Sequence, residues 1–170
     1  RIAYGYSVSV SPLHMAMVYA TIANDGVRLP PRLVDARIDA DGAEHPAERK
    51  PGTRVVSEKT ALEVQHMLET TTVEGSGASG ALEKYRVGSK TGTAEAPSPN
   101  GGYDGYTVSY AGIAPMDDPK YVAVVTLQRP KGDLYYIEPG KTFQKVMEQV
   151  LTTNNVAPSE GEPVTYPIEY

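Results

Sequence analysis

The chain contains no cysteine among its 170 residues. It therefore has no thiol nucleophile, no disulfide framework, and no zinc or iron–sulfur site ligated by cysteine. Long hydrophobic runs are also missing, because the longest apolar stretches, at 15–23 and 121–127, fall far short of the roughly 20 residues of a membrane-spanning helix. The sequence accordingly predicts no transmembrane segment.

Basic residues are fewer than acidic ones. Lysine and arginine number 16 and aspartate and glutamate 21, which gives a formal net charge of −5. Binding to nucleic-acid phosphates needs an excess of positive charge, so we expect no nucleic-acid partner. With 40% hydrophobic and 22% charged residues the composition is that of a globular protein, and the length suits one domain or a large piece of one.

Both ends of the sequence carry information about domain organisation. The chain opens at Arg1 without the charged and apolar regions of a signal peptide, and its first residues read as the middle of a domain. We therefore expect a fragment in which 1–155 belong to one domain. The remainder, 156–170, contains three prolines and is predicted to be a loosely ordered tail.

Three helices are predicted, over 11–24, 57–72 and 141–153. Ser11 followed by Pro12 is a helix start, Gly26 is a stop, and Ser57 is a capping residue. The first helix is apolar on all faces, so we expect it to be buried on most sides. The inward-facing residues of the other two are predicted to be Ala61, Leu62, Val64 and Leu68, and Phe143, Val146, Met147 and Val150.

Three strands are predicted, over 85–95, 106–114 and 120–129, and their short connections favour an antiparallel meander. The run 121–127 is continuously apolar, which is typical of a strand covered on both faces. The segment 39–53 is expected to be a polar loop, and 75–80, which contains three glycines, a flexible turn.

Several short motifs match functional patterns without the context that those patterns require. Three glycines in 75–80 fit a dinucleotide-binding spacing but follow a helix, and Gly140-Lys141-Thr142 lacks the first glycine of a phosphate-binding loop. The three histidines are far apart in the sequence, so no metal site is predicted. No Gly-x-Ser-x-Gly elbow occurs, and nothing in the sequence calls for a cofactor.

The segment 88–95 is the most informative part of the chain. It reads Gly-Ser-Lys-Thr-Gly-Thr-Ala-Glu on a predicted strand, although glycines weaken a strand interior. A glycine in a strand often allows another backbone or a ligand to come close, and Lys90 adds positive potential beside the hydroxyls of Thr91 and Thr93. These residues favour an edge strand that pairs with an extended anionic ligand. The alternative is an edge strand whose lysine and glycines only prevent aggregation.

Lys90-Thr91-Gly92 is also the KTG box of penicillin-binding proteins and class A β-lactamases. It lies within a longer ordered match, over roughly 1–155, that resembles the transpeptidase domain of class B penicillin-binding proteins. The matching segments are 5–13, 20–26, 55–57, 67–68, 73–78, 87–94, 102–103, 110–115 and the helix around Phe143.

The resemblance implies an α+β fold of the β-lactamase and transpeptidase type, with helices flanking an antiparallel sheet, three of whose five strands lie in this chain. The chain would be the C-terminal half of the domain. The implied enzyme is a serine D,D-transpeptidase that cross-links peptidoglycan stem peptides ending in D-Ala-D-Ala and that β-lactams acylate. It would act on the extracytoplasmic face of the bacterial cell membrane, held by an N-terminal anchor that is absent here.

Roles for the box residues follow from the same resemblance. Lys90 would be catalytic, supplying positive potential and a contact in the proton network. Thr91 and Gly92 would bind the substrate, through its carboxylate and through close approach of its backbone. Thr93 would offer its amide to the oxyanion hole and its hydroxyl to the carboxylate. Because strand residues alternate between faces, these groups can act together only at a strand edge.

Two motifs of the family are missing from the printed sequence. No Ser-x-x-Lys occurs, so the nucleophile and its base are expected on an upstream segment. Ser98-Pro99-Asn100 fits Ser-x-Asn, but it follows the box instead of preceding it. The segment 135–142 also departs from the small residues that usually lead to the last helix. A β-lactam sensor domain, a serine β-lactamase and an inactive structural subunit of the same fold are the alternatives.

Overall fold

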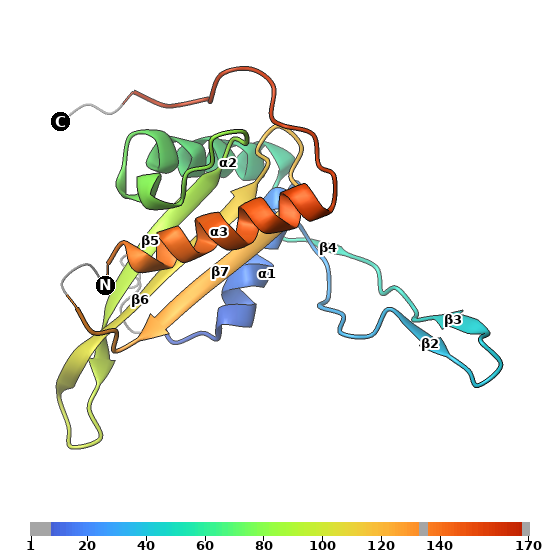
Figure 1. Cartoon of the computed structure of the whole chain (residues 1–170), viewed down its shortest axis with the longest axis horizontal. Coiled ribbons are helices and arrows are strands. Elements are labelled where there is room, and N and C mark those ends of the chain that lie inside the picture. Colours follow the sequence, from blue (N-terminus) through green and yellow to red (C-terminus); the bar gives the residue numbers. More distant parts are fainter. Residues whose placement is uncertain (1–7, 133–135, 168–170) are drawn as a thin grey trace.

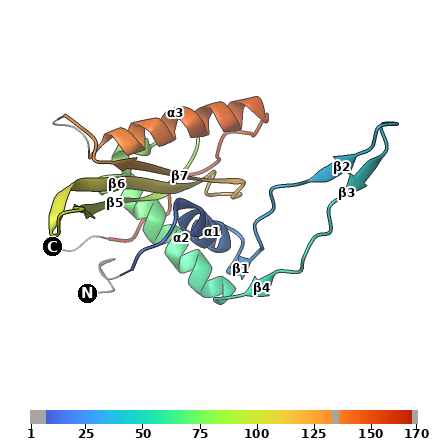
Figure 2. The same ribbon diagram turned by 90° about the horizontal axis from the view of Figure 1, so that it is seen from below.

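The computed structural model describes residues 8–132 and 136–167. A three-stranded sheet forms the centre. The last α-helix of the chain covers one face, and the two earlier α-helices lie on the other side (Figures 1 and 2). Gly5, Tyr6 and Ser7 of the matching segments and Tyr135 lie outside the described residues. Within the described ranges, no helix is both long and apolar enough to cross a membrane.

Helix α1, Pro12–Ala23, begins as predicted: the Ser11 hydroxyl accepts a hydrogen bond from the His14 amide, and Gly26 follows the helix with φ 81°. Tyr19 packs against the sheet. Burial on most sides does not occur within the described residues, because Leu13 and Val18 are 55% and 53% exposed. The described part of the chain supplies partners to only one side of this apolar helix.

Helix α2, Glu58–Val73, is capped by Ser57 as predicted, but its buried side is largely polar. Ala61 is buried and Leu68 packs against the core, whereas Leu62 is half-exposed, so its predicted inward position is wrong. The reason is that polar groups with specific partners occupy the inner face. The fully or nearly buried polar residues of α2 are Gln65, Glu69, Thr70 and Thr72.

The central sheet is the predicted antiparallel meander, with strand order β5-β6-β7. Its strands are β5 (Gly88–Pro97), β6 (Tyr103–Ala114) and β7 (Tyr121–Gln128). Lys90 pairs with Ala111 and Thr91 with Tyr110. One face of the sheet packs against α1 and the other against α3, so β7 has helices on both faces, as its sequence predicts.

Helix α3, Glu138–Thr153, starts earlier than predicted and lies across one face of the sheet (Figure 2). Phe143, Met147 and Leu151 are buried against that face. Val146 is half-exposed, so its predicted place in the buried stripe is wrong. The spacing of 143, 147 and 151 keeps three consecutive turns of the helix in contact with the sheet.

The segment 75–80 is not a flexible turn. Ser76–Gly80 forms a 3₁₀ helix, η2, and Gly77 and Gly80 are buried. A Cβ atom at Gly77 would lie 2.5 Å from Ser89 Oγ, and one at Gly80 would lie 2.4 Å from the Tyr110 ring. The glycines therefore serve close packing of η2 onto β5 and β6.

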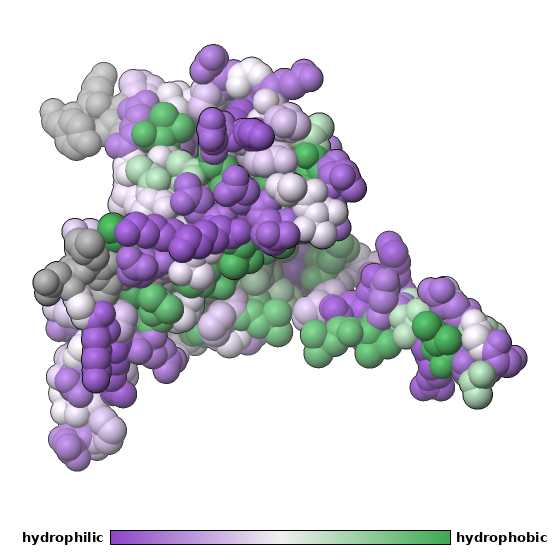
Figure 3. Space-filling model, in the orientation of Figure 1, coloured by the Kyte–Doolittle hydropathy of each residue, from purple (hydrophilic) through white to green (hydrophobic). Residues whose placement is uncertain are grey.

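An arm projects from the sheet and its helices (Figures 1 and 2). Its base is β1 (Val27–Arg28) paired with β4 (Thr53–Arg54), and its tip is β2 (Ala36–Ile38) paired with β3 (Glu44–Pro46). The predicted polar loop 39–53 thus contains strand β3 and the start of β4. Paired backbone forms there despite the polar sequence. Leu33 on the arm is 96% exposed. Figure 3 shows hydrophobic surface on the arm.

The segment after α3 returns across the molecule toward α2 (Figure 1). The Tyr166 amide donates to Thr70 Oγ1 (2.9 Å), and the Val164 amide donates to Glu69 Oε2 (3.1 Å). Ser159 contacts Arg86 and Asp117. Loose ordering of the whole of 156–170 stays a prediction, although these hydrogen bonds attach 159–166 to α2 and to the entry of β5.

Candidate functional site

The candidate site lies along the outer edge of β5. Among the described residues only β6 pairs with β5, so one side of the strand has no neighbouring strand. The C-terminal end of α2 crosses that side at Ser89, where the Thr71 hydroxyl contacts the Ser89 carbonyl oxygen. Over residues 90–95 the strand is exposed or half-buried, and Ala96 is buried again. The edge is therefore accessible at the box residues.

Lys90 and Thr91 point to opposite faces of the sheet but meet at this edge. Lys90 is opposite Ala111, which packs with α1, and Thr91 is opposite Tyr110, which packs with α3. The Lys90 ammonium nevertheless lies 3.0 Å from the Thr91 carbonyl oxygen and 3.5 Å from its Oγ1. A positive charge and a hydroxyl thus stand together at the strand margin, as a contact with an anionic group requires.

Ser76 contributes a second hydroxyl to the same edge. It opens η2, and its Oγ lies 2.8 Å from Thr91 Oγ1. The pair is exposed to solvent. Two hydroxyls and one ammonium group can together hold a carboxylate, since all three can donate hydrogen bonds to its oxygens.

Gly92 and Thr93 continue the edge. A Cβ atom at Gly92 would lie 2.6 Å from Ser109 Oγ on β6, so the absence of a side chain leaves room for that hydroxyl. Thr93 pairs with Val108, and its side chain is exposed. The predicted roles of both residues toward a ligand stay predictions.

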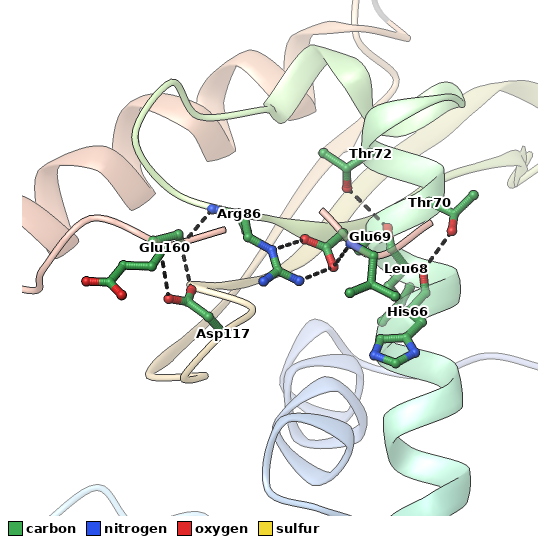
Figure 4. Close-up of polar contacts among 10 residues, drawn as sticks. His66, Leu68, Glu69, Thr70, Thr72, Arg86, Asp117 and Glu160 are labelled. Atoms are coloured by element: carbon green, nitrogen blue, oxygen red, sulfur yellow. Dashed lines mark hydrogen bonds and ion pairs between the residues drawn. The ribbon is translucent and has the colours of Figure 1, made fainter. Parts of the chain in front are cut away.

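An ion pair attaches the segment just before β5 to helix α2. Arg86, two residues before the strand, makes a two-pronged contact with Glu69 of α2 (Figure 4). The hydrogen bond to Glu69 raises the pKa of the Arg86 guanidinium further above its usual value, against the opposing effect of burial. The Arg86 amide donates to Ser159 Oγ (2.9 Å), whose hydroxyl donates to Asp117 (2.5 Å). Three segments are thereby tied to the entry of the box strand.

The sequence located the box residues, and the structure brings Lys90, Thr91, Gly92 and Thr93 together on one edge. Sequence reasoning misses Ser76, which lies 15 positions from Thr91 in a segment predicted to be a flexible turn. It also missed Tyr110 and Thr72, which contact Ser89. The alternation of side chains along a strand does place Ser89 on the same face as Thr91. Nothing in the sequence near Ser89, however, indicates that Tyr110 and Thr72 contact it.

Metal-binding groups are scarce in the same region. Within 8–132 and 136–167, no three His, Asp or Glu side chains come close enough to hold a metal ion. His45 instead pairs with Asp39 on the arm, 2.7 Å apart. The polar side chains of the box residues 90–93 are thus two hydroxyls and one ammonium group.

The chain matches the family described as the penicillin binding protein transpeptidase domain over residues 1–151. Penicillin-binding protein PbpB of Mycolicibacterium smegmatis is 36% identical, over 95% of this chain and 27% of the relative. Peptidoglycan D,D-transpeptidase FtsI of Escherichia coli is 35% identical, over 91% of this chain and 25% of the relative. The chain therefore spans about a quarter of the length of these curated relatives.

Solved structures agree with the sequence relatives. Penicillin binding protein 3 of Mycobacterium tuberculosis complexed with aztreonam superposes with a TM-score of 0.84 and 31% identity, covering 99% of this chain and 40% of that one. The same protein complexed with ampicillin gives a TM-score of 0.81 and 31% identity, covering 95% and 39%. These neighbours have the α+β transpeptidase fold, which is the fold class that the sequence predicted.

Proposed function

The chain belongs to the transpeptidase domain family of penicillin-binding proteins, and from this membership we propose that it forms the KTG side of a peptidoglycan D,D-transpeptidase site. Its relatives are class B members, named PbpB and FtsI. The observation that carries the proposal is the meeting of the Lys90 ammonium with the Thr91 and Ser76 hydroxyls at the edge of β5.

The reaction has two acyl-transfer steps. A serine oxygen attacks the carbonyl carbon of the penultimate D-alanine of a stem peptide, and the amide bond to the terminal D-alanine breaks. The serine proton passes through a neighbouring base to the leaving amine, and an ester remains. An amine of a second stem peptide then attacks the ester carbonyl, loses a proton, and releases the serine as its alcohol.

The residues of β5 would bind the donor peptide for the first step. The terminal carboxylate of the donor would contact the hydroxyls of Thr91 and Thr93, with the Lys90 ammonium providing positive potential. Gly92 would let the peptide backbone approach the strand, and the Thr93 amide would donate to the developing oxyanion. Losing one oxyanion donor typically lowers a rate by about 10²–10³-fold.

A β-lactam would occupy the same edge. Its carboxylate corresponds to that of the terminal D-alanine, and opening of its amide ring by the serine leaves an ester on the enzyme. The relatives of known structure were solved with aztreonam and with ampicillin, which supports β-lactams as ligands of this site.

The serine and its lysine base would come from a segment that carries Ser-x-x-Lys and Ser-x-Asn. Neither motif occurs in this sequence in the required order, and the chain corresponds to only about a quarter of its relatives. We place the whole protein on the extracytoplasmic face of the cell membrane, since its proposed substrate is the peptidoglycan stem peptide.

The test uses the full-length protein that contains this chain. We expect a fluorescent penicillin to label it covalently, and we expect a stem peptide ending in D-Ala-D-Ala together with an acceptor amine to yield free D-alanine and a cross-linked product. Labelling without cross-linking would indicate a sensor domain, and rapid hydrolysis of the penicillin would indicate a β-lactamase. Either result would overturn the assignment as a transpeptidase.

A further inference from the structure

Ser89, immediately before the KTG box, lies at the centre of a buried group of hydroxyls. Its side chain is 0% exposed, and its Oγ lies 2.7 Å from Thr72 Oγ1 and 2.6 Å from the Tyr110 hydroxyl. The Tyr110 hydroxyl also lies 2.6 Å from the Gly77 carbonyl oxygen. The group therefore joins four elements, namely α2, η2, β5 and β6.

The protons of this group can be arranged in one order that satisfies every short contact. The Gly77 carbonyl can only accept, so the single phenolic proton of Tyr110 is donated to it. Ser89 then donates to Tyr110, and the single Thr72 proton is shared between Ser89 Oγ at 2.7 Å and the Leu68 carbonyl oxygen at 3.2 Å. Burial raises the pKa of Tyr110 to about 12, against a smaller lowering by Ser89, so the phenol keeps its proton at neutral pH. The result is a directed hydroxyl chain, Thr72 to Ser89 to Tyr110 to Gly77.

Close packing holds η2 against this hydroxyl chain. A Cβ atom at Gly77 would lie 2.5 Å from Ser89 Oγ, and one at Gly80 would lie 2.4 Å from the Tyr110 hydroxyl. No real Cβ atom approaches another atom so closely, so a side chain at either position would push η2 away from β5. The spacing between η2 and β5 is therefore set by contacts with the hydroxyl chain.

The same spacing determines the geometry of the accessible edge. Ser76 is the first residue of η2, next to Gly77, and its Oγ meets Thr91 Oγ1 at 2.8 Å. Thr91 is two residues after Ser89 on β5 and on the same face. A shift of η2 relative to β5 would therefore separate Ser76 from Thr91 before it disturbed the pairing of β5 with β6.

We propose that Thr72, Ser89 and Tyr110 are positioning residues of the transpeptidase site, which act by holding Ser76 in register with Lys90 and Thr91. The proposal rests on the function given above and adds Ser76 to the groups that contact the substrate carboxylate. None of the three positioning hydroxyls touches the substrate. Their removal leaves a buried partner unpaired, and the relaxation of that partner moves η2.

The test compares variants that differ by one hydroxyl in the full-length protein. Tyr110→Phe and Thr72→Val each remove one hydroxyl, and Thr72→Ser keeps the hydroxyl while losing a methyl group. We expect the second-order rate constant of acylation by a fluorescent penicillin to fall about tenfold in Tyr110→Phe and Thr72→Val, because small misplacements of binding groups lower rates strongly. Thr72→Ser should retain a rate within about twofold of the parent.

A core variant separates positioning from stability. Leu151→Val removes one methylene from the buried core at the C-terminal end of α3. It should lower the melting temperature without changing the acylation rate. Equal rates in the parent, Tyr110→Phe and Thr72→Val would overturn the positioning role while leaving the proposed function standing. A fall in rate that follows the melting temperature across all four variants would also overturn it. An unreactive parent would overturn the proposed function itself, and the inference with it.

Ser76→Ala provides the direct check on the edge. It removes the exposed hydroxyl without touching the buried chain, so it should lower the acylation rate as Tyr110→Phe does, and the double variant should lose little more than either single one. Additive losses would contradict the inference, because they would mean that Tyr110 acts on acylation by a route independent of Ser76.

Discussion

Glu69 and Arg86 form a buried two-pronged ion pair, with Arg86 Nε 2.6 Å from Glu69 Oε1 and a terminal guanidinium nitrogen 2.7 Å from Oε2. The Glu69 side chain is 1% exposed and that of Arg86 15%. Glu69 also accepts a hydrogen bond from the Val164 amide. One carboxylate therefore connects α2, the entry of β5 and the segment that follows α3. Such a pair is costly to break from one side, because the remaining charge stays buried.

We expect Glu69→Ala to destabilise the protein by about 3–5 kcal/mol, since it leaves the Arg86 guanidinium without its partner. The matched control is Glu63→Ala on the same helix, where the carboxylate is 3.8 Å from Lys59 in an exposed pair. That change should cost less than about 0.5 kcal/mol. Urea denaturation of the full-length protein measures both, and equal midpoints for the two variants would contradict the prediction.

Asp117 should make the free energy of unfolding depend on pH in the acidic range. Burial raises the pKa of its carboxyl group. The opposing effect of hydrogen bonds from Ser159 and the Glu160 amide, together with the charge of Arg86, is larger, so the net pKa is lowered from the usual 3.8. A carboxyl group with a depressed folded pKa stabilises the fold above its unfolded pKa and loses that effect as the pH falls through the folded value.

Asp117→Asn provides the measurement. The difference in unfolding free energy between the parent and this variant should be constant above about pH 5 and should shrink below about pH 4. A difference that stayed the same down to pH 2 would mean that the carboxylate charge contributes nothing at this position.

Gly112 of β6 is expected to tolerate no side chain. A Cβ atom there would lie 2.7 Å from Cζ of Phe143 on α3, whose ring is fully buried between that helix and the sheet. Gly112→Ala should therefore cost about 1–3 kcal/mol through overpacking. In the double variant with Phe143→Leu the loss should be smaller than the sum of the single losses, because the shorter side chain makes room. Thermal unfolding tests this, and strict additivity would count against the steric explanation.

Lys90→Ala should lower the rate of acylation by a penicillin about 10–100-fold, because a charge-assisted contact with the ligand carboxylate is lost. Lys145→Ala, an exposed lysine on α3, is the control and should leave the rate unchanged. The second-order rate constant in the full-length protein is the quantity to measure. A rate in Lys90→Ala equal to that of the control would exclude Lys90 from ligand binding.

The 170 residues alone should not react with penicillin, because the sequence offers no Ser-x-x-Lys nucleophile. We also expect them to fold poorly, since α1 leaves Leu13 and Val18 half-exposed. A fluorescent penicillin and a gel test the first point, and circular dichroism with thermal melting tests the second. A labelled band at 18.3 kDa would show that the chain contains its own nucleophile.

Much of the fold was predictable from local sequence signals. Ser11 and Ser57 start α1 and α2 as expected, because a hydroxyl that accepts a backbone amide is a local interaction. The meander order also follows from the short connections between apolar runs. The arm was not predictable in the same way, because β3 forms from Glu44, His45 and Pro46, which have no strand preference.

The box strand was predictable, but the groups around it were not. Lys90 to Thr93 are contiguous and form a motif, whereas Ser76 reaches Thr91 only through the packing of η2. The buried face of α2 could not be predicted from hydrophobic spacing alone. Gln65, Glu69 and Thr72 are buried there because each has a hydrogen-bonding partner far away in the sequence. Such pairs exist only in the tertiary structure.

The pairing of β5 with β6 carries a further consequence. If β5 slipped by one residue along β6, Lys90 would turn toward α3 and Thr91 toward α1, so the two faces of the edge would exchange their side chains. Gly88 beside Met116 and Gly112 beside Phe143 favour the observed alignment, because a Cβ atom in either place would collide with those side chains. The small residues of the interior thus determine which side chains β5 presents on each of its faces.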